Sequence, residues 1–203
     1  EKREHFIEYA KLISLAHKLR RNLVIVRKGE IQVKPGQELR MDVLWRGKQK
    51  NASLMLAIAY LIRLSGKWKK TKLLLKTIIA EEAQAEHVRK RLEVFITERR
   101  LEADASVITH EPGRDVFTTI EDNIHDANLV FVGMRPPGKD ESIEEYSTYY
   151  EGLLQKTQSF PATILALASE DIEFHKIFIE EKIPDEKLED KHEENPEEEP
   201  QEK

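Results

Sequence analysis

Residues 41–62 read MDVLWRGKQKNASLMLAIAYLI, and this stretch decides how the rest of the chain is interpreted. Its first five residues are apolar apart from Asp42, which predicts a short strand. A basic loop containing Gly47 follows, and the uninterrupted apolar residues 54–62 then predict a helix. A helix that is apolar on nearly every face is either buried or lies against a partner. We therefore expect a strand–loop–helix unit whose helix is buried under the sheet or, alternatively, forms a dimer interface.

The alternation of strand and helix patterns continues on both sides of this unit. Apolar, β-branched strand patterns cover residues 22–27, 39–45, 71–79, 105–109, 128–132 and 163–167. Helical periodicity covers residues 3–20, 51–64, 81–99, 113–125 and 141–157. The strands show little polar–apolar alternation, as expected where both faces of a sheet are buried. These patterns predict an α/β fold: a doubly wound, mostly parallel sheet with helices on both faces.

The two ends of the chain differ from this body. We expect an amphipathic N-terminal helix in residues 1–21 and the α/β domain in residues 22–180. Residues 181–203 are expected to be a disordered acidic tail, because residues 184–203 are too polar to fold alone. Residues 172–179 (IEFHKIFI) are predicted to be one more edge strand or a docking segment. The sequence has no initiator Met and opens inside a helical pattern, so we expect a piece of a longer polypeptide.

Composition excludes several classes of function. The 203 residues include 39% hydrophobic residues, enough for a core, and no cysteine, which excludes disulfides, zinc–thiolate sites and cysteine nucleophiles. The net charge of −5 arises in the tail: residues 184–203 carry −7, so the preceding residues carry +2 and offer no electrostatic argument for nucleic acid. The longest apolar run is far shorter than the roughly 20 residues of a membrane-spanning helix.

The loop after residue 45 contains the basic residues Arg46, Lys48 and Lys50. It follows a predicted strand and precedes a helix, a place where doubly wound sheets bind ligands and where helix termini attract anions. Neither the Walker A spacing nor the dinucleotide fingerprint is present. A solvated surface loop is therefore the simpler interpretation, and phosphate binding is the alternative.

Asp42 is the one charged residue within an apolar strand, and its burial without a partner would be costly. We expect a structural role for it, as a cap, in an ion pair with Arg46, or pointing outward at a strand edge. Ser53 lacks the surroundings of a nucleophile elbow, and the seven histidines show no metal-ligand spacing. The sequence therefore predicts no catalytic residue, no metal and no cofactor.

Four segments, in order, resemble the cytoplasmic carboxy-terminal domain of cation-chloride cotransporters. They are residues 22–25 (NLVI), 41–45 (MDVLW), 54–56 (LML) and 129–137 (LVFVGMRPP), spread over most of residues 22–168. Leu44 departs from the family pattern, which usually has Trp there. The compact layout resembles prokaryotic members, which are often grouped with amino-acid permeases. The positions that match the family motifs are Asp42, Val43, Trp45, Leu54, Met55, Leu56, Gly133, Arg135, Pro136 and Pro137.

This resemblance implies a regulatory and dimerisation domain on the cytoplasmic side of the plasma membrane, as part of an integral membrane protein. It implies no catalysis and no ion-translocation site in this chain. The expected partners are the transmembrane transport domain of the same polypeptide and a second copy of the chain. It implies neither nucleic-acid binding nor insertion of this segment into the membrane.

Residues 105–137 also resemble the closing half of universal stress proteins, in which a glycine-rich loop after the matching strand wraps ATP phosphates. Here Gly133 is followed by Met134, Arg135, Pro136 and Pro137 before the next glycine. The two prolines remove two backbone N–H donors from that loop. We therefore expect a universal-stress-protein-like fold whose nucleotide site is lost. The alternative function is a stand-alone soluble protein of this kind that binds a nucleotide.

Overall fold

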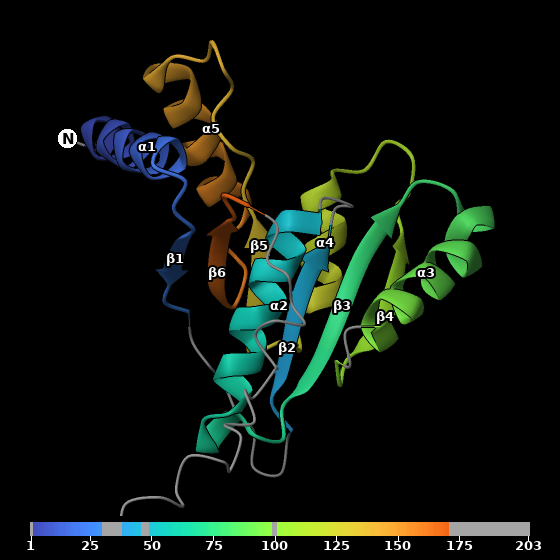
Figure 1. Ribbon diagram of the computed structural model, residues 1–203. Coiled ribbons are helices and arrows are strands. Elements are labelled where there is room, and N and C mark those ends of the chain that lie inside the picture. Colours follow the sequence, from blue (N-terminus) through green and yellow to red (C-terminus); the bar gives the residue numbers. More distant parts are fainter. Residues whose placement is uncertain (1, 30–37, 46–48, 99–100, 171–203) are drawn as a thin grey trace, which may run out of the picture.

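A single six-stranded sheet forms the centre of the computed structural model, which describes residues 2–29, 38–45, 49–98 and 101–170 (Figure 1). The strand order is β1-β6-β5-β2-β3-β4. All neighbouring strands are parallel except β1, which pairs antiparallel with β6 at one edge. The predicted α/β class and all six predicted strands are confirmed: β1 (Leu23–Arg27), β2 (Arg40–Trp45), β3 (Lys72–Ile79), β4 (Asp104–Thr109), β5 (Leu129–Gly133) and β6 (Ala162–Leu167).

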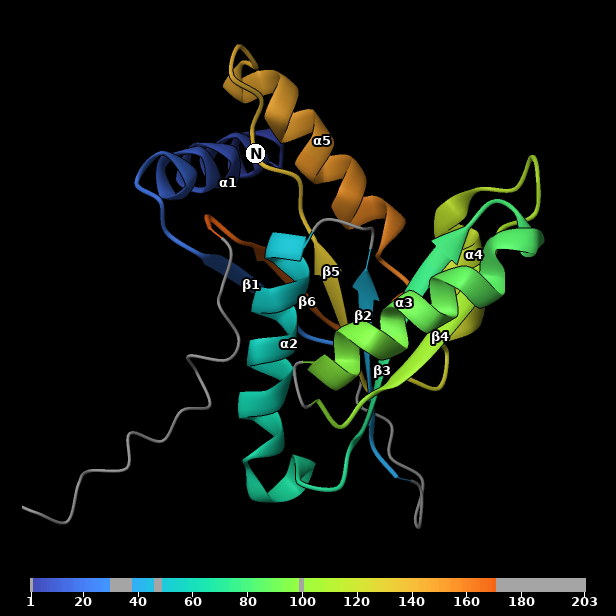
Figure 2. The same cartoon turned by 45° about the vertical axis from the view of Figure 1, so that its right-hand side comes forward.

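Helices cover both faces of this sheet. The α-helices of the described residues are α1 (Lys2–Lys18), α2 (Gln49–Arg63), α3 (Ala85–Glu98), α4 (Val116–Ile124) and α5 (Ile143–Lys156), with short 3-10 turns at η1 (Gly66–Trp68) and η2 (Glu82–Gln84). Figure 2 shows α2 and α3 in front of the sheet, α4 behind it, and α1 beside α5. Successive residues of β2 serve opposite faces, since side chains of a strand alternate: Val43 joins the core under α2 and α3, and Leu44 joins the core under α4 and α5.

The apolar helix of the opening stretch is buried in its first half. Leu54, Met55 and Leu56 are 7%, 1% and 0% exposed and belong to the core formed with β2 and β3. Near the end of α2, Leu61 and Leu64 are 56% and 63% exposed. Burial, the first of the two expected environments, is therefore confirmed for the first half of the helix, and its role in a dimer remains a prediction.

Polar caps set the starts of the last two helices. The carboxylate of Asp115 accepts hydrogen bonds from the backbone N–H groups of Phe117 and Thr118, at 2.8 and 3.3 Å, which begins α4. Ser142 and Glu145 form a reciprocal capping box at the start of α5. These caps explain why both helices begin two or three residues later than periodicity alone predicts.

The N-terminal helix packs on the outer layer rather than on the sheet. Phe6 and Tyr9 lie against Tyr150 of α5, with ring centroids 6.4 and 5.7 Å apart. The predicted domain boundaries at residues 21 and 181 remain predictions, and residues 172–179 and the acidic tail lie outside the described residues. In the described part of the chain, no helix has the length and apolarity to cross a membrane.

The chain reverses its direction across the sheet beside β2. From β2 it proceeds to β3 and β4 on one side, and it then returns to β5 and β6 on the other side. In doubly wound sheets, ligands bind outside the carboxyl ends of the strands at such a switch point. The edge formed by the carboxyl ends of β2 and β5 is therefore where a site is expected.

Candidate functional site

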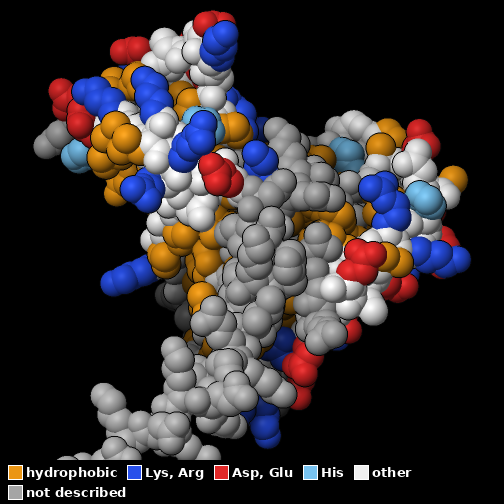
Figure 3. Space-filling view, viewed as in Figure 1, with side chains coloured by type: hydrophobic (Ala, Val, Ile, Leu, Met, Phe, Trp, Pro, Cys, Tyr) orange, Lys and Arg blue, Asp and Glu red, His pale blue; other side chains and the backbone are white. Residues whose placement is uncertain are grey.

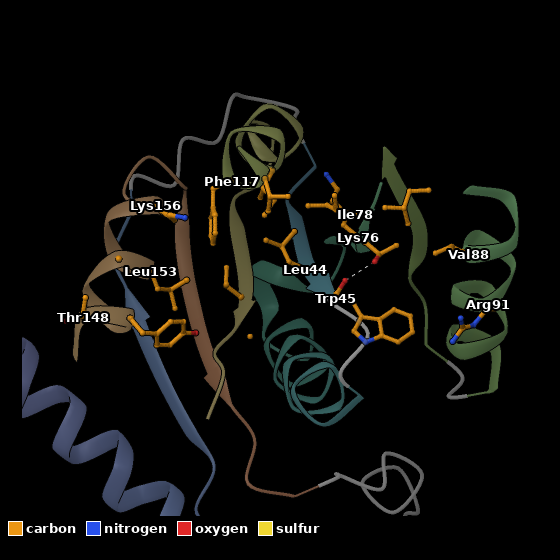
Figure 4. Close-up of a pocket in the computed structure, with 18 residues that line it drawn as sticks. Leu44, Trp45, Lys76, Ile78, Val88, Arg91, Phe117, Thr148, Leu153 and Lys156 are labelled. Carbon is orange, nitrogen blue, oxygen red and sulfur yellow. Dashed lines mark hydrogen bonds between the residues drawn. The ribbon is translucent and has the colours of Figure 1, made fainter. Parts of the chain in front are cut away.

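A cavity of about 720 Å³ lies at this edge, near the carboxyl ends of β2, β3 and β5 (Figure 4). The sheet, α4 and α5 supply most of its wall, and Val88 and Arg91 of α3 complete it. The cavity therefore occupies the expected location of a ligand site. The remaining lining residues are Leu44, Trp45, Lys76, Thr77, Ile78, Ile79, Val116, Phe117, Ile120, Val132, Gly133, Thr148, Tyr149, Gly152, Leu153 and Lys156.

The charged side chains in this wall are all basic. They are Lys76, Arg91 and Lys156, and no Asp or Glu among the described residues lines the cavity. Figure 4 shows Lys156 beside Phe117 at one end of the cavity and Arg91 at the other. The Lys156 ammonium lies 5.1 Å from the centre of the Phe117 ring and 3.9 Å from a carboxylate oxygen of Asp115, and its side chain is 54% exposed.

Lys76 does not offer its ammonium group to the cavity, because a buried carboxylate already binds it. Its Nζ lies 2.8 Å from Oδ2 of Asp42, which is fully buried. Arg40 approaches the same carboxylate, with Nε 3.0 Å from Oδ1 and Nη2 donating to Oδ2 at 3.1 Å. The Nε and Oδ1 atoms are close enough for an ion pair but are not aligned for a hydrogen bond.

The same two cations hold the end of α4. The Asn123 carbonyl, in the last turn of α4, accepts hydrogen bonds from Lys76 and, at 3.4 Å, from Arg40. Carbonyls at a helix carboxyl end lack partners within the helix and attract positive charge. Asp42 thus has the structural role that was predicted, but with Arg40 and Lys76 as partners. An outward orientation at a strand edge is wrong, because β2 lies in the middle of the sheet.

The loop after β5 is fastened to α5 through Arg135. Its guanidinium pairs with both carboxylate oxygens of Glu141, with Nη1 2.6 Å from Oε2. It also lies 4.1 Å from the ring centre of Tyr149 and 5.2 Å from that of Tyr146. The backbone of Arg135 donates to the Tyr149 hydroxyl at 3.0 Å and accepts from the Tyr146 hydroxyl at 2.9 Å. Such combined bidentate and stacked contacts hold a guanidinium in one geometry.

The electrostatics of this loop follow from those contacts. The hydrogen bonds from Arg135 hold the pKa of Glu141 down to about 2. Burial raises the pKa of Tyr146, so its hydroxyl stays a donor to the loop carbonyl. The carboxylate of Glu141 also accepts the backbone N–H of Gly138 at 2.8 Å.

The donors that remain in the loop are poorly suited to phosphate. Glu141 already binds the Arg135 guanidinium and the Gly138 N–H, and Pro136 and Pro137 have no backbone N–H to donate. An anion placed here would have to displace a carboxylate that carries the same sign of charge. The loss of the nucleotide site nevertheless stays a prediction.

Gly133 is required by a close approach of α2. A Cβ atom at this position would lie 2.9 Å from Nδ2 of Asn51. Asn51 donates from Nδ2 to the Met134 carbonyl at 2.6 Å and accepts the Ala168 N–H at Oδ1 at 2.8 Å. One side chain from the first turn of α2 therefore ties together the ends of β5 and β6.

The other positions predicted from the sequence are distributed over the core and the surface. Val43, like Leu54, Met55 and Leu56, lies in the core, and Trp45 stacks on Phe95 with ring centroids 5.1 Å apart. Lys50 is exposed in the first turn of α2. Arg46 and Lys48 lie outside the described residues, so the proposed anion loop remains a prediction.

Several residues of the site were not singled out in the sequence. They are Asn51, Lys76, Glu141, Tyr149, Gly152 and Lys156. Two of them carried a signal: Lys76 interrupts an apolar strand, and Gly152 interrupts a helical pattern. The others look like ordinary surface residues until the fold brings them together.

The described histidines do not assemble into a metal site. In residues 2–29, 38–45, 49–98 and 101–170, no group of three His, Cys, Asp or Glu side chains is placed to hold a metal ion. His110 contacts the Thr119 hydroxyl at 3.0 Å, and His125 contacts the Asp122 carbonyl at 2.8 Å. Both contacts are local, so the prediction that the chain binds no metal stays a prediction.

Comparisons with known proteins were made by sequence and by structure. No family model and no curated protein matches the sequence. The fold is similar to the crystal structure of the cytoplasmic domain of a prokaryotic cation chloride cotransporter, with a TM-score of 0.55, 19% identity, and coverage of 84% of this chain and 61% of that chain. A protein of the universal stress protein family from Burkholderia pseudomallei gives a TM-score of 0.41 and 15% identity over 64% of this chain and 96% of that chain. The first similarity supports the sequence resemblance at the level of the fold.

Proposed function

We propose that this chain is the cytoplasmic domain of a membrane transporter of the cation-chloride cotransporter class. There it acts as a regulatory and dimerisation module, and it contains neither a catalytic centre nor an ion-translocation site. The observation that carries this proposal is the fold shared with a cotransporter cytoplasmic domain over 84% of the chain. The strand–loop–helix unit of residues 41–62, on which the sequence resemblance rests, supplies the central strand of that fold.

The outer face of α1 supports a role in assembly. Leu12 and Leu15 of α1 and Leu19, which follows its last residue, are 59%, 53% and 60% exposed and follow one another at steps of three and four residues. Figure 3 shows hydrophobic side chains at the surface in the upper left of the molecule, where Figure 1 places α1 and α5. The opposite face of α1 is already buried against α5, with Ala10 and Ile13 fully or almost fully covered. A second apolar stripe on a helix that has already buried one marks a contact with another protein surface.

A second copy of the chain fits this stripe. The spacing of its three leucines is that of a short a/d seam, which pairs with an identical seam across a two-fold axis. We assign this surface, named here the α1 stripe (Leu12, Leu15 and Leu19), to the dimer, with the transport domain preceding it in the same polypeptide.

The location of the native protein tests the attachment to a transporter. Cells that express the native gene are separated into membrane and soluble fractions and probed with an antibody raised against residues 1–170. We expect a membrane-bound polypeptide much heavier than the 23.7 kDa of this chain. A soluble band of that mass alone would overturn the proposal and favour the stand-alone alternative.

Light scattering after size-exclusion chromatography tests the dimer separately. Leu15→Glu places a charge in the middle of the α1 stripe and is expected to shift the chain from dimer to monomer. Val94→Glu is the matched control, because Val94 is also exposed, at 55%, but lies on α3. A monomeric wild type, or an equal effect of both variants, would contradict the assignment of the dimer to α1.

A further inference from the structure

We infer that the cavity at the carboxyl ends of β2, β3 and β5 binds an amphipathic carboxylate, a molecule with an apolar body and one acidic group. This inference concerns the folded chain alone and does not depend on its attachment to a transporter. It rests on the size and apolar walls of the cavity, on the sign of the charges in those walls, and on a glycine that keeps one wall open.

The size and walls fit a small organic molecule. Ligand cavities in proteins commonly measure about 300–1,000 Å³ and are lined mainly by apolar side chains, and this cavity measures about 720 Å³. Its apolar wall combines aliphatic side chains with the rings of Trp45, Phe117 and Tyr149. An apolar body of about ten carbon atoms can be removed from water there without leaving polar groups of its own unpaired.

The charges in the wall select an acid. The charged residues at the cavity are Lys76, Arg91 and Lys156, and no described Asp or Glu lines it. The Lys76 ammonium is already bound by the Asp42 carboxylate and the Asn123 carbonyl, which leaves Lys156 and Arg91. Lys156 lies beside the aromatic wall, and its ion pair with Asp115 is long, at 3.9 Å. A small movement of the Lys156 side chain can therefore bring its ammonium group to a ligand carboxylate.

Gly152 gives an independent indication that the cavity is used. It lies in the interior of α5, where glycine destabilises a helix relative to alanine. A Cβ atom at this position would meet no other atom within 4 Å, so packing within the chain does not require a glycine. The absent side chain widens the cavity wall at this point, as expected where a ligand approaches a helix backbone closely.

A nucleotide polyphosphate fits the same place poorly. The backbone loop after β5, which would have to hold the phosphates, binds the carboxylate of Glu141 through Arg135 and Gly138. The remaining cations, Lys156 and Arg91, lie at opposite ends of the cavity (Figure 4). Two separated cations suit a single acidic group at one end better than three adjacent phosphates.

Calorimetric titration of the full chain with decanoate tests this inference, with 1-decanol as the neutral counterpart. We expect one decanoate per chain. Gly152→Leu projects a side chain into the cavity from a position with free space and keeps or raises the melting temperature, and it should weaken binding of both compounds. Gly66→Leu is the matched control, since a Cβ atom at Gly66 would also meet no atom within 4 Å, but Gly66 does not line the cavity.

The acidic group is tested by Lys156→Met, which keeps the apolar stem of the side chain and removes its charge. Loss of one partly exposed ion pair should weaken decanoate binding about fivefold and leave 1-decanol binding unchanged. The inference is overturned if decanoate does not bind, if Gly152→Leu binds it as the wild type does, or if Lys156→Met weakens both compounds equally. Displacement of decanoate by ATP at lower concentrations would instead assign the cavity to a nucleotide.

Discussion

Replacing Asp42 by Asn tests how strongly the ion pairs of Asp42 with Arg40 and Lys76, under α4, stabilise the fold. The substitution keeps the shape of the side chain and removes one negative charge from a fully buried position. It leaves the Lys76 ammonium, 5% exposed, and the Arg40 guanidinium, 19% exposed, facing each other without their shared carboxylate. The asparagine can still hydrogen-bond, so the measured loss reports the missing charge.

The expected loss is large on the scale of protein stability. Removing one partner from a buried ion pair costs about 3–5 kcal/mol, because the remaining charge stays buried without compensation. Whole domains are stable by only about 5–15 kcal/mol. We therefore expect a large decrease in the free energy of unfolding, measured by urea denaturation followed by circular dichroism and by the fluorescence of the two tryptophans, of which Trp45 lies on the same strand.

An exposed ion pair in the same sheet provides the control. Lys72 and Asp104 lie 3.3 Å apart across β3 and β4, with side chains 53% and 65% exposed. Asp104→Asn should cost less than about 1 kcal/mol, because solvent screens an exposed pair. An equal loss for Asp42→Asn and Asp104→Asn would refute the reasoning.

A double variant keeps the test open if the single variant does not fold. In Asp42→Asn with Lys76→Met, the unpaired ammonium is removed and only Arg40, which reaches solvent and Asp126, remains charged. We expect the double variant to recover about 2 kcal/mol relative to Asp42→Asn alone, since apolar replacements of buried pairs are well tolerated. If the loss in the double variant equalled the sum of the losses in Asp42→Asn and Lys76→Met, Asp42 and Lys76 would not interact in the manner described.

Three further variants probe the loop after β5 and the cavity wall. Arg135 lowers the pKa of Glu141 to about 2, so their pairing should stabilise the fold fully above about pH 4.3, the pKa of an unfolded glutamate, and should weaken as the pH falls towards 2. Glu141→Gln should therefore lower the free energy of unfolding by about 1 kcal/mol at pH 7, where Arg135 is 39% exposed and partly screened by solvent. The same variant should cost little at pH 2, and urea denaturation at both pH values measures the difference. Gly133→Ala should lower the free energy of unfolding by about 2 kcal/mol, because the new methyl group forces Asn51 away from its two backbone partners. Unchanged resonances of the Asn51 side-chain amide in NMR spectra would contradict this. Gly152→Ala should raise the unfolding free energy by about 0.5–1 kcal/mol, because the new methyl group meets open space in a helix, and a lower melting temperature would argue against that geometry.

The secondary structure could be predicted from the sequence because the apolar, β-branched runs of the strands and the helical spacing of apolar residues are both strong signals. Within the described residues, six apolar, β-branched runs became six strands, and five helical patterns became five helices. The main errors lie at helix starts: α3 begins four residues later than predicted, after the 3-10 turn η2, and the caps Asp115 and Ser142 fix the first turns of α4 and α5 by specific hydrogen bonds. Periodicity does not contain that information, since a cap acts through one side-chain oxygen.

The site was less predictable than the fold. Asp42 stood out because a charge in an apolar strand needs a partner, but the nearby basic residues in the sequence pointed to Arg46, whereas its partners are Arg40 and Lys76. Lys76 lies on the neighbouring strand, two residues beyond Leu74, which is the register partner of Asp42. Strand order and register decide the pair with Lys76, and neither is visible in local sequence, whereas Arg40 lies two residues before Asp42 on the same strand.

The sequence by itself determined the class of the fold, the apolar character of the helix after β2 and the concentration of acidic charge in residues 184–203, because each depends on how apolar and charged residues are spaced along the chain. Only the tertiary structure decided which side chains share an edge of the sheet. It brought Lys156, Gly152 and Arg91 from two helices to one cavity, and it placed Glu141 on the donors of the loop after β5. The physical reason is that hydrophobic burial acts over whole segments and tolerates small shifts, whereas hydrogen bonds, ion pairs and cavity walls depend on distances of a few ångströms between residues remote in sequence.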